Sequence, residues 1–224
     1  MMSEDLSALQ RLLDRRYSCR GFLGKQVPQE TIEEIVKTAQ KVPSWCNSQP
    51  WQLDICSPKK TKALADALTK AAMAGLQSPD IVFPERYLGV YKERRSTCGW
   101  QLYDAVGITK GDREASYKQM IENFRFFGAP QVAVVTTPKE LGAYGAVDCG
   151  AFVTAFTLAA QGFGVATIAQ AAVAGIAPVV RENLGLSTNR NILCAISFGY
   201  EDKDHPANQF RTIRAEPSDV IDWH

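Results

Sequence analysis

The chain has 224 residues, of which 46% are hydrophobic and 22% are charged, which is enough apolar sequence for a buried core and argues against a disordered protein. Its 25 basic and 24 acidic side chains leave a net charge of +1, which excludes a surface that is basic overall and suited to nucleic acid. Six cysteines occur without a C-x-x-C pair, a pattern typical of a reduced, cytoplasmic protein rather than of a disulfide scaffold or zinc site.

The N-terminal part is expected to be mainly helical. Ser3 is placed to cap a first helix, and the leucines after it recur on one helical face until the pattern breaks at 17–22. The predicted elements are, in chain order, a helix from Ser3 to this break, a helix from Pro28 to Pro43, a strand at 51–55 and a helix at 58–74.

The rest of the chain alternates between helices and strands. Residues 75–90 are interrupted by glycine and proline and are predicted to form a mobile excursion. The elements predicted after it are helices near 91–106 and 112–124, a strand at 131–137, a helix at 144–161, a strand at 165–169, a helix at 177–184 and a strand at 191–198. This order, without repeats or a clear linker, predicts one α+β or α/β layered domain over residues 1–224.

The two ends of the chain and one apolar segment indicate where the protein is located in the cell and how its subunits assemble. The N-terminus has acidic residues and no apolar segment, so no secretory signal is expected. Cys149 to Val180 lacks charged side chains, which raises a membrane helix as an alternative, but polar residues and glycines interrupt it and favour a buried helix followed by a core strand. The polar tail at 205–224 has no core of its own, so it either frays or extends onto a partner subunit.

The sequence offers little for acid–base or metal chemistry. The only histidines, His205 and His224, both lie in the polar tail, which argues against a Ser–His or Cys–His nucleophile and against a His-ligated metal. The segment GFGVATIAQ at 162–170 lacks the third glycine of a dinucleotide-binding loop and precedes a strand instead of following one. We therefore expect a bound cofactor to carry the chemistry, with no metal and no protein group in a catalytic role.

Two basic segments are candidate anion sites. In an extended chain Arg16, Ser18 and Arg20 point to one side and suit a phosphate or an electron-rich ring edge. The alternative is a solvated turn after the first helix. The tail segment Phe210–Arg214 adds two further arginines, for which a solvated tail is the alternative.

A third segment, Pro43–Trp51, joins a helix to a strand with two tryptophans and several small polar side chains. A loop of this kind can hydrogen-bond the edge of a flat heterocycle and stack on its face. The alternative is a tight turn whose amides satisfy their own backbone.

These motifs together resemble the FMN-dependent nitroreductase family. The resemblance rests on R-x-S-x-R-x-F at 16–22, P-S-x-x-N-x-Q-P-W at 43–51, N-x-x-F-F-G-A-P at 123–130 and the tail motif ending in F-R-T-I-R at 210–214. The third motif and the Gln-Ala-Ala sequence at 170–172 resemble the nitrobenzoate-reductase branch. The family implies an α+β fold with a central mixed β-sheet flanked by helices.

The resemblance also implies a homodimer with two FMN sites at its interface, each built from both chains. In one chain Arg16, Ser18 and Arg20 would contact the FMN phosphate and the N1/O2 edge of the ring, with Tyr17 contributing by its backbone or by packing. The other subunit would contribute Pro43, Ser44, Trp45 and Asn47, with Gln49 in support of that loop.

Further along the chain, the resemblance implies that Gln170 and Ala171 present backbone N–H groups to flavin N5 or O4. Arg211 and Arg214 would close on the phosphate and so order the tail. Two departures from the family concern substrate preference: Tyr17 stands where a second basic residue is common, and Ala171-Ala172 where some relatives have an acid–glycine pair.

The implied activity is that of an NAD(P)H oxidoreductase that transfers hydride through flavin N5 to nitroaromatic, quinone or similar electron-poor acceptors in a ping-pong cycle. Phe126 and Phe127 would cover the aromatic acceptor, with core packing as the alternative. The partners implied are small molecules and a second copy of the chain, without nucleic acid or membrane.

Other functions on the same scaffold remain open at this point. They are a reductive dehalogenase, an enone reductase, a flavin-dependent oxidase or dehydrogenase, and a non-enzymatic flavin-binding protein. Charged residues within 75–115, at 85–86 and 92–95, together with Tyr87, would suit a lid for a charged amino-acid substrate and hence dehalogenation.

Overall fold

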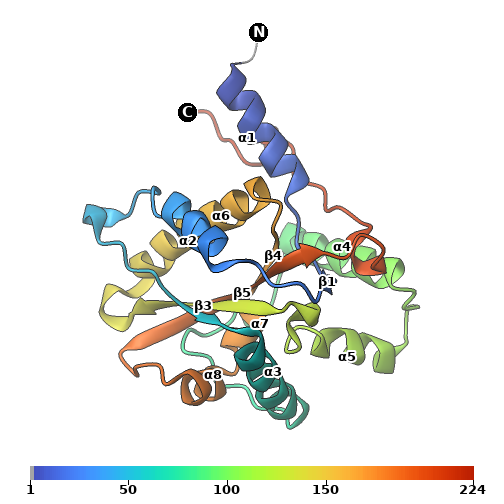
Figure 1. The fold of residues 1–224 in the computed structure, drawn as a ribbon. Helices are drawn as coiled ribbons and strands as arrows, with labels where there is room; N and C mark the ends of the chain where they lie inside the picture. The colour runs from blue at the N-terminus through green and yellow to red at the C-terminus, as the bar shows by residue number, and fades with distance from the viewer. Residues whose placement is uncertain (1–2) are drawn as a thin grey trace.

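A five-stranded sheet runs through the middle of the computed structural model, which describes residues 3–224 (Figure 1). Its strands are β1 (Phe22–Leu23), β2 (Gln52–Cys56), β3 (Gln131–Pro138), β4 (Ala166–Gln170) and β5 (Arg190–Glu201). The order is β1-β5-β3-β2, with β4 also paired to β5, and these strand pairs are antiparallel. An isolated parallel bridge between Ser18 and Thr167 makes the arrangement mixed.

The helices lie on both faces of this sheet, as Figure 1 shows. They are α1 (Glu4–Arg15), α2 (Gln29–Ala39), α3 (Pro58–Met73), α4 (Gly89–Ala105), α5 (Arg113–Ile121), α6 (Gly142–Gly162), α7 (Ala171–Ala174) and α8 (Ala177–Leu184). The Ser3 hydroxyl accepts a hydrogen bond from the Leu6 amide at 3.2 Å, so the predicted cap of the first helix is confirmed. The α+β prediction is confirmed as well.

Several predicted boundaries differ from the observed ones. The second helix ends at Ala39 instead of continuing to Pro43, because the chain turns at Gln40 into the Pro43–Trp51 loop. The last strand extends to Glu201, where its final residues pair with β1. The sequence patterns did not reveal β1 or α7, because a two-residue strand and a one-turn helix are too short to show a period.

The core is divided by the sheet into two clusters. Successive side chains of β3 alternate between them, since Val132 and Val134 face α3 and α8 while Ala133 and Val135 face α2 and α6. All four side chains are fully buried. The QVAVVTT pattern therefore predicts the central strand correctly, because a strand covered by helices on both faces needs apolar residues at every position.

Helix α6 is covered on one side only. Its sheet-facing residues Phe152 and Phe156 are fully buried, whereas Tyr144 and Val147 are 60% and 66% exposed. Among the described residues, Lys139–Gly162 is the segment long and apolar enough to cross a membrane, yet it packs on the sheet as the predicted buried helix does. The outward apolar face of α6 is thus largely exposed in one chain.

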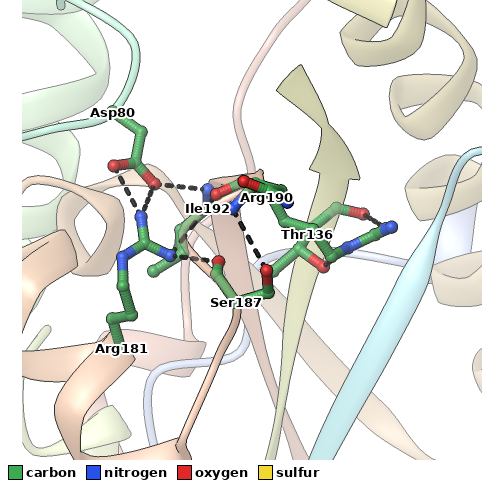
Figure 2. Close-up of polar contacts among 7 residues, drawn as sticks. Asp80, Thr136, Arg181, Ser187, Arg190 and Ile192 are labelled. Carbon is green, nitrogen blue, oxygen red and sulfur yellow. Dashed lines mark hydrogen bonds and ion pairs between the residues drawn. The ribbon is translucent and has the colours of Figure 1, made fainter. Parts of the chain in front are cut away.

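The connection between α3 and α4 lacks regular structure, as predicted, but it is fastened to the sheet. The Asp80 carboxylate pairs with Arg181 of α8 at 2.6 Å and accepts a hydrogen bond from the Ile192 amide at 2.8 Å (Figure 2). Arg181 also donates to the Ser187 carbonyl at 3.0 Å. Because both members of this ion pair are largely buried, the contacts hold the connection against the start of β5.

The tail leaves the sheet after β5 and passes the end of α1. Residues near its start are buried, but Ile213 and Trp223 are 78% and 90% exposed. In Figure 1 the last segment (red) crosses α1 and ends on the other side of it in this view, and Thr212 and Arg214 share a cavity with Leu13 and Asp14. The placement of the tail on a partner subunit stays a prediction.

Candidate functional site

A cavity of about 470 Å³ lies between the end of α1, the tail and α4, and we call it the arginine cavity. It brings together two predicted basic segments from opposite ends of the chain. Its lining residues are Leu13, Asp14, Arg16, Tyr17, Ser18, Arg20, Cys98, Phe210, Arg211, Thr212 and Arg214. All residues predicted to hold a phosphate thus share one cavity.

The N-terminal wall of the cavity is fixed by α1 and β4. The Arg16 amide donates to the Leu12 carbonyl at 3.0 Å and closes α1. The chain then extends along β4, where the Cys19 amide donates to the Thr167 carbonyl at 3.0 Å. Cys19 is fully buried, and burial raises the pKa of its thiol to about 11. This extended segment presents Arg16, Ser18 and Arg20 to the cavity.

The tail wall is held by Asn208, which is 2% exposed. The oxygen of its side-chain amide accepts a hydrogen bond from the Arg20 backbone amide at 2.7 Å. The nitrogen of its side-chain amide donates to the Gly21 carbonyl at 2.9 Å and to the Asp202 carbonyl at 2.8 Å. A Cβ atom on Gly21 would lie 2.2 Å from Cγ of His205, so glycine is required for this close approach. The three hydrogen bonds of the Asn208 side chain, which we call the Asn208 clasp, fix the tail against the N-terminal segment.

The electrostatics of the cavity favour an anion. Within residues 3–224, Arg16, Arg20, Arg211 and Arg214 have no carboxylate within 4.0 Å. Arg20, Arg211 and Arg214 donate instead to neutral oxygens, as Arg211 does to the Asn208 carbonyl at 2.7 Å. Burial lowers the pKa of Arg20, and burial together with the positive charge of Arg214 lowers that of Arg16.

Converging cations that repel one another are stabilised by a bound group with several negative oxygens. A phosphate monoester such as that of FMN meets this requirement, and the Ser18 hydroxyl adds a donor in the same lining. The residues of the cavity therefore fit the phosphate end of the implied cofactor.

Strand β4 leads from the arginine cavity toward the residues predicted to contact the flavin ring. Thr167 lies beside Ser18, and Ala171 follows four residues later, about 13 Å further along an extended strand. The Gln170 side chain donates to the Asn123 carbonyl at 2.8 Å and accepts from the Ser197 hydroxyl, so it is occupied inside the protein. Any contact from Gln170 to a ligand would thus come from its backbone, as predicted.

The Pro43–Trp51 loop is not part of the arginine cavity. It contains left-handed backbone at Cys46, Asn47 and Gln49, with φ of 52°, 54° and 46°. The Trp45 amide donates to both carboxylate oxygens of Asp148 at 3.2 Å. In Figure 1 the loop (light blue) projects beyond α2 on the side away from α4.

The loop is also fixed internally and against α6. The Gln49 amide donates to the Ser44 hydroxyl at 2.9 Å, and the Trp45 ring meets Tyr144 edge-on at 4.3 Å. Pro43, Ser44, Trp45, Asn47 and Gln49 therefore form a rigid, outward-facing loop rather than a wall of the cavity within their own chain.

Phe126 and Phe127 occupy a turn with left-handed backbone, at φ of 56° and 52°. Phe126 is fully buried in the core, where it packs among the residues under α3 and α8. Phe127 is nearly buried, and its ring faces the Arg20 guanidinium at 5.8 Å. Their predicted contact with an acceptor stays a prediction.

Of residues 75–115, only Cys98 lines the arginine cavity. The charged residues at 85–86 and 92–95 are exposed, and Arg95 lies over the Tyr87 ring at 5.4 Å. Another cavity, of about 800 Å³, lies beside α3 and has Lys62, Lys70 and Asp66 in its lining, whereas the arginine cavity is lined by four arginines and a single carboxylate, Asp14.

Sequence reasoning assigned no role to Asn208 or Cys98. Asn208 acts on a segment 188 residues earlier, a separation at which no sequence period exists. Cys98 lies on α4, where none of the residues is buried and no apolar face marks its orientation. The P-A-N sequence at 206–208 was the one signal that could have identified Asn208.

Comparisons with known proteins agree with this fold. The profile described as Nitroreductase family matches residues 13–200. The chain is 35% identical over 214 residues to the nitroreductase NfnB of Mycolicibacterium smegmatis, covering 95% of this chain and 91% of that protein. It is 32% identical over 219 residues to a 4-nitrobenzoate reductase of Nocardioides sp., covering 96% and 88%.

A solved structure shows the same arrangement. The crystal structure of the FMN-dependent nitroreductase NfnB from Mycobacterium smegmatis in complex with NADPH has a TM-score of 0.94 and 33% identity, covering 99% of this chain and 100% of that chain. The layered α+β fold is thus that of a flavoprotein oxidoreductase scaffold. The chain belongs to the nitroreductase family.

Proposed function

We propose that this protein is an FMN-dependent NAD(P)H oxidoreductase that reduces nitroaromatic compounds and similar electron-poor acceptors. The observation that carries the proposal is the arginine cavity, in which four guanidiniums, without carboxylate partners among residues 3–224, converge beside β4. The relatives named above are nitroreductases, one is a 4-nitrobenzoate reductase, and the NfnB structure is FMN-dependent and holds NADPH.

The chain's own residues bind and orient the cofactor. Arg16, Ser18, Arg20, Arg211 and Arg214 would hold the phosphate. The N-terminal segment, fixed along β4, would direct the flavin ring toward Gln170 and Ala171. A guanidinium near the ring edge stabilises negative charge there, and a backbone N–H at the same edge fixes the ring orientation.

When bound, FMN would supply the hydride-transfer chemistry that links NAD(P)H to the acceptor. The protein therefore needs no acid–base side chain at the reacting atoms, in agreement with histidines confined to positions 205 and 224. Protons for the acceptor would come from solvent.

We further propose that the protein is a homodimer in which the Pro43–Trp51 loop of one chain completes the ring end of the other chain's site. Two observations support this proposal. The loop is rigid and faces outward, and both α1 and α6 have exposed apolar side chains. On α1, Leu6, Leu9 and Leu13 are exposed, and a continuous apolar surface of this kind indicates an interface.

The location proposed is the cytoplasm. All six cysteines are free thiols in the structure, including three that are buried. Free thiols are maintained in a reducing compartment, where pyridine nucleotides are also available.

An anaerobic titration with NADPH tests the proposed activity. The purified protein, reconstituted with FMN, should lose its visible flavin absorbance on addition of NADPH and regain it on addition of 4-nitrobenzoate. Absorbance that persists in the presence of both NADPH and NADH would refute the reductase function, because the cofactor would then be carried but not used.

A further inference from the structure

Tyr17 supports Arg211 through the face of its ring. The guanidinium carbon of Arg211 lies 3.6 Å from the centroid of the Tyr17 ring, well inside the range of a cation–π contact. One nitrogen of the same guanidinium donates to the Asn208 carbonyl at 2.7 Å and the Phe210 carbonyl at 2.8 Å. Arg211 is thus held from two directions, although it lies on an exposed part of the tail.

The Tyr17 hydroxyl has a different environment. It is buried, and it makes no hydrogen bond within the described part of the chain. Burial, aided by the nearby Glu201 carboxylate, raises the pKa of the phenol above its ordinary value, so the ring is neutral. The π face of Tyr17 therefore has a clear partner, whereas its hydroxyl has none.

We propose that Tyr17 is a positioning residue that holds Arg211 at the phosphate end of the arginine cavity and thereby makes the site select a phosphorylated flavin over an unphosphorylated one. This inference rests on the proposed function. An arginine on an exposed tail loses much side-chain freedom when it binds a ligand, and a stacked ring removes that freedom beforehand. This preorganisation increases affinity only for a ligand that has a phosphate for Arg211 to bind.

A purely structural role for Tyr17 predicts something else. Tyr17 belongs to the segment that follows α1 and lies along β4, so loss of packing there would loosen the whole segment, including Arg16, Ser18 and Arg20. Binding of every flavin would then weaken together. The ratio of the FMN and riboflavin affinities separates the two roles, because riboflavin lacks the phosphate.

The experiment uses the full-length protein after removal of flavin, with dissociation constants measured by flavin fluorescence for FMN and riboflavin. Tyr17→Leu should weaken FMN binding about fivefold to tenfold, the size of one cation–π contact, and leave riboflavin binding unchanged. Tyr17→Phe keeps the ring face and should bind both flavins like the wild type. Tyr117→Leu, a tyrosine on α5 outside the cavity, is the matched control and should change neither affinity.

A double-mutant cycle gives the sharper readout. Because Tyr17 acts through Arg211, the variant Tyr17→Leu/Arg211→Ala should bind FMN no more weakly than Arg211→Ala alone. If Tyr17→Leu does not fold, Tyr17→Met fills a similar volume without a π face and takes its place.

Three results would overturn the inference. They are an equal loss for both flavins in Tyr17→Leu, independent losses that multiply in the double variant, and a wild type that binds FMN and riboflavin equally well. A wild type that binds neither flavin would instead refute the proposed function, so the two failures are distinguishable.

Discussion

The arginine cavity and the Pro43–Trp51 loop are built in opposite ways. The cavity is assembled from the two ends of one chain, joined by the Asn208 clasp and by the contact of Arg211 with Tyr17. The loop is rigid by itself, through left-handed backbone and its hydrogen bonds to Asp148, but it faces away from its own body. Each motif is preorganised, yet the loop takes no part in the arginine cavity of its own chain.

This difference suggests a division of labour in the site. A phosphate needs several cations in fixed positions, and a single chain provides them through long-range contacts. The flat ring needs a second wall, which the loop of a partner chain would supply. Variants of the cavity should therefore weaken FMN binding far more than riboflavin binding, whereas variants of the loop should weaken both equally.

The largest effect is expected for Arg20→Ala. It removes a charge that is held beside Ser18 and between the rings of Phe127 and Phe210. We expect FMN binding to weaken about 100-fold, as for the loss of a charge-assisted bond in a partly buried site, with a much smaller change for riboflavin. Fluorescence titration measures both, with Arg113→Ala on α5 as the control. A loss below threefold for FMN would contradict the assignment of Arg20.

A stop codon after Gln209 is expected to have the second largest effect. The truncated chain keeps the Asn208 clasp but lacks Arg211 and Arg214. FMN binding should weaken about 10- to 50-fold, because two guanidiniums are lost from an exposed tail rather than from a buried position. A truncated protein that retains full FMN affinity would show that the tail does not reach the phosphate.

Asn47→Gly tests the loop half of the comparison. Glycine accepts the positive φ of this position, so the variant removes the side-chain amide and keeps the loop conformation. FMN and riboflavin affinities should both fall about fivefold, the size of one hydrogen bond. Cys46→Gly, the neighbouring position with the same backbone conformation, is the control and should leave both affinities unchanged. A loss restricted to FMN would place Asn47 at the phosphate instead.

Asp54→Asn is expected to have the smallest effect, and it concerns stability rather than binding. One carboxylate oxygen of Asp54 is buried without a hydrogen-bond partner in the described structure, and burial raises the pKa of this carboxyl although Arg190 opposes the shift. A raised pKa in the folded state means that the folded protein binds the proton more tightly. The charge therefore costs stability as pH rises through the unfolded and then the folded pKa.

The variant should raise Tm on the order of 2 °C at pH 7, with a difference that disappears near pH 3, where the wild-type carboxyl is protonated. Thermal unfolding followed by circular dichroism at the two pH values measures it. A variant that is less stable at pH 7 would show that the attraction to Arg190 outweighs burial.

The fold was predictable from the sequence where the pattern of hydrophobic residues matches the burial of those residues in the structure. The run Val132–Val135 predicts a central strand because both of its faces are covered. The exposed apolar face of α6 was not predictable, since the sequence of an apolar helix face does not show whether its own sheet or a partner chain covers it. The Asp80–Arg181 pair, which joins residues 101 apart in the chain, likewise leaves no local signal.

The candidate site shows the same limit. The alternation of Arg16, Ser18 and Arg20 places them in one cavity, because side-chain direction in an extended segment follows from sequence position alone. That Arg211 meets Tyr17 depends on the path of the tail, which is set by the burial of Asn208 and the absence of a side chain at Gly21. Such packing arises only in the folded chain.

The most direct test of the shared site is complementation between two defective chains. Arg20→Ala carries an intact loop, and Asn47→Gly combined with Asp148→Ala carries an intact cavity. In a mixed dimer, isolated by two different affinity tags, one of the two sites would combine the intact cavity of one chain with the intact loop of the other. We predict one tightly bound FMN per mixed dimer and restored NADPH-dependent reduction of 4-nitrobenzoate. A mixed dimer that binds FMN no better than its parents would show that each site is formed by a single chain.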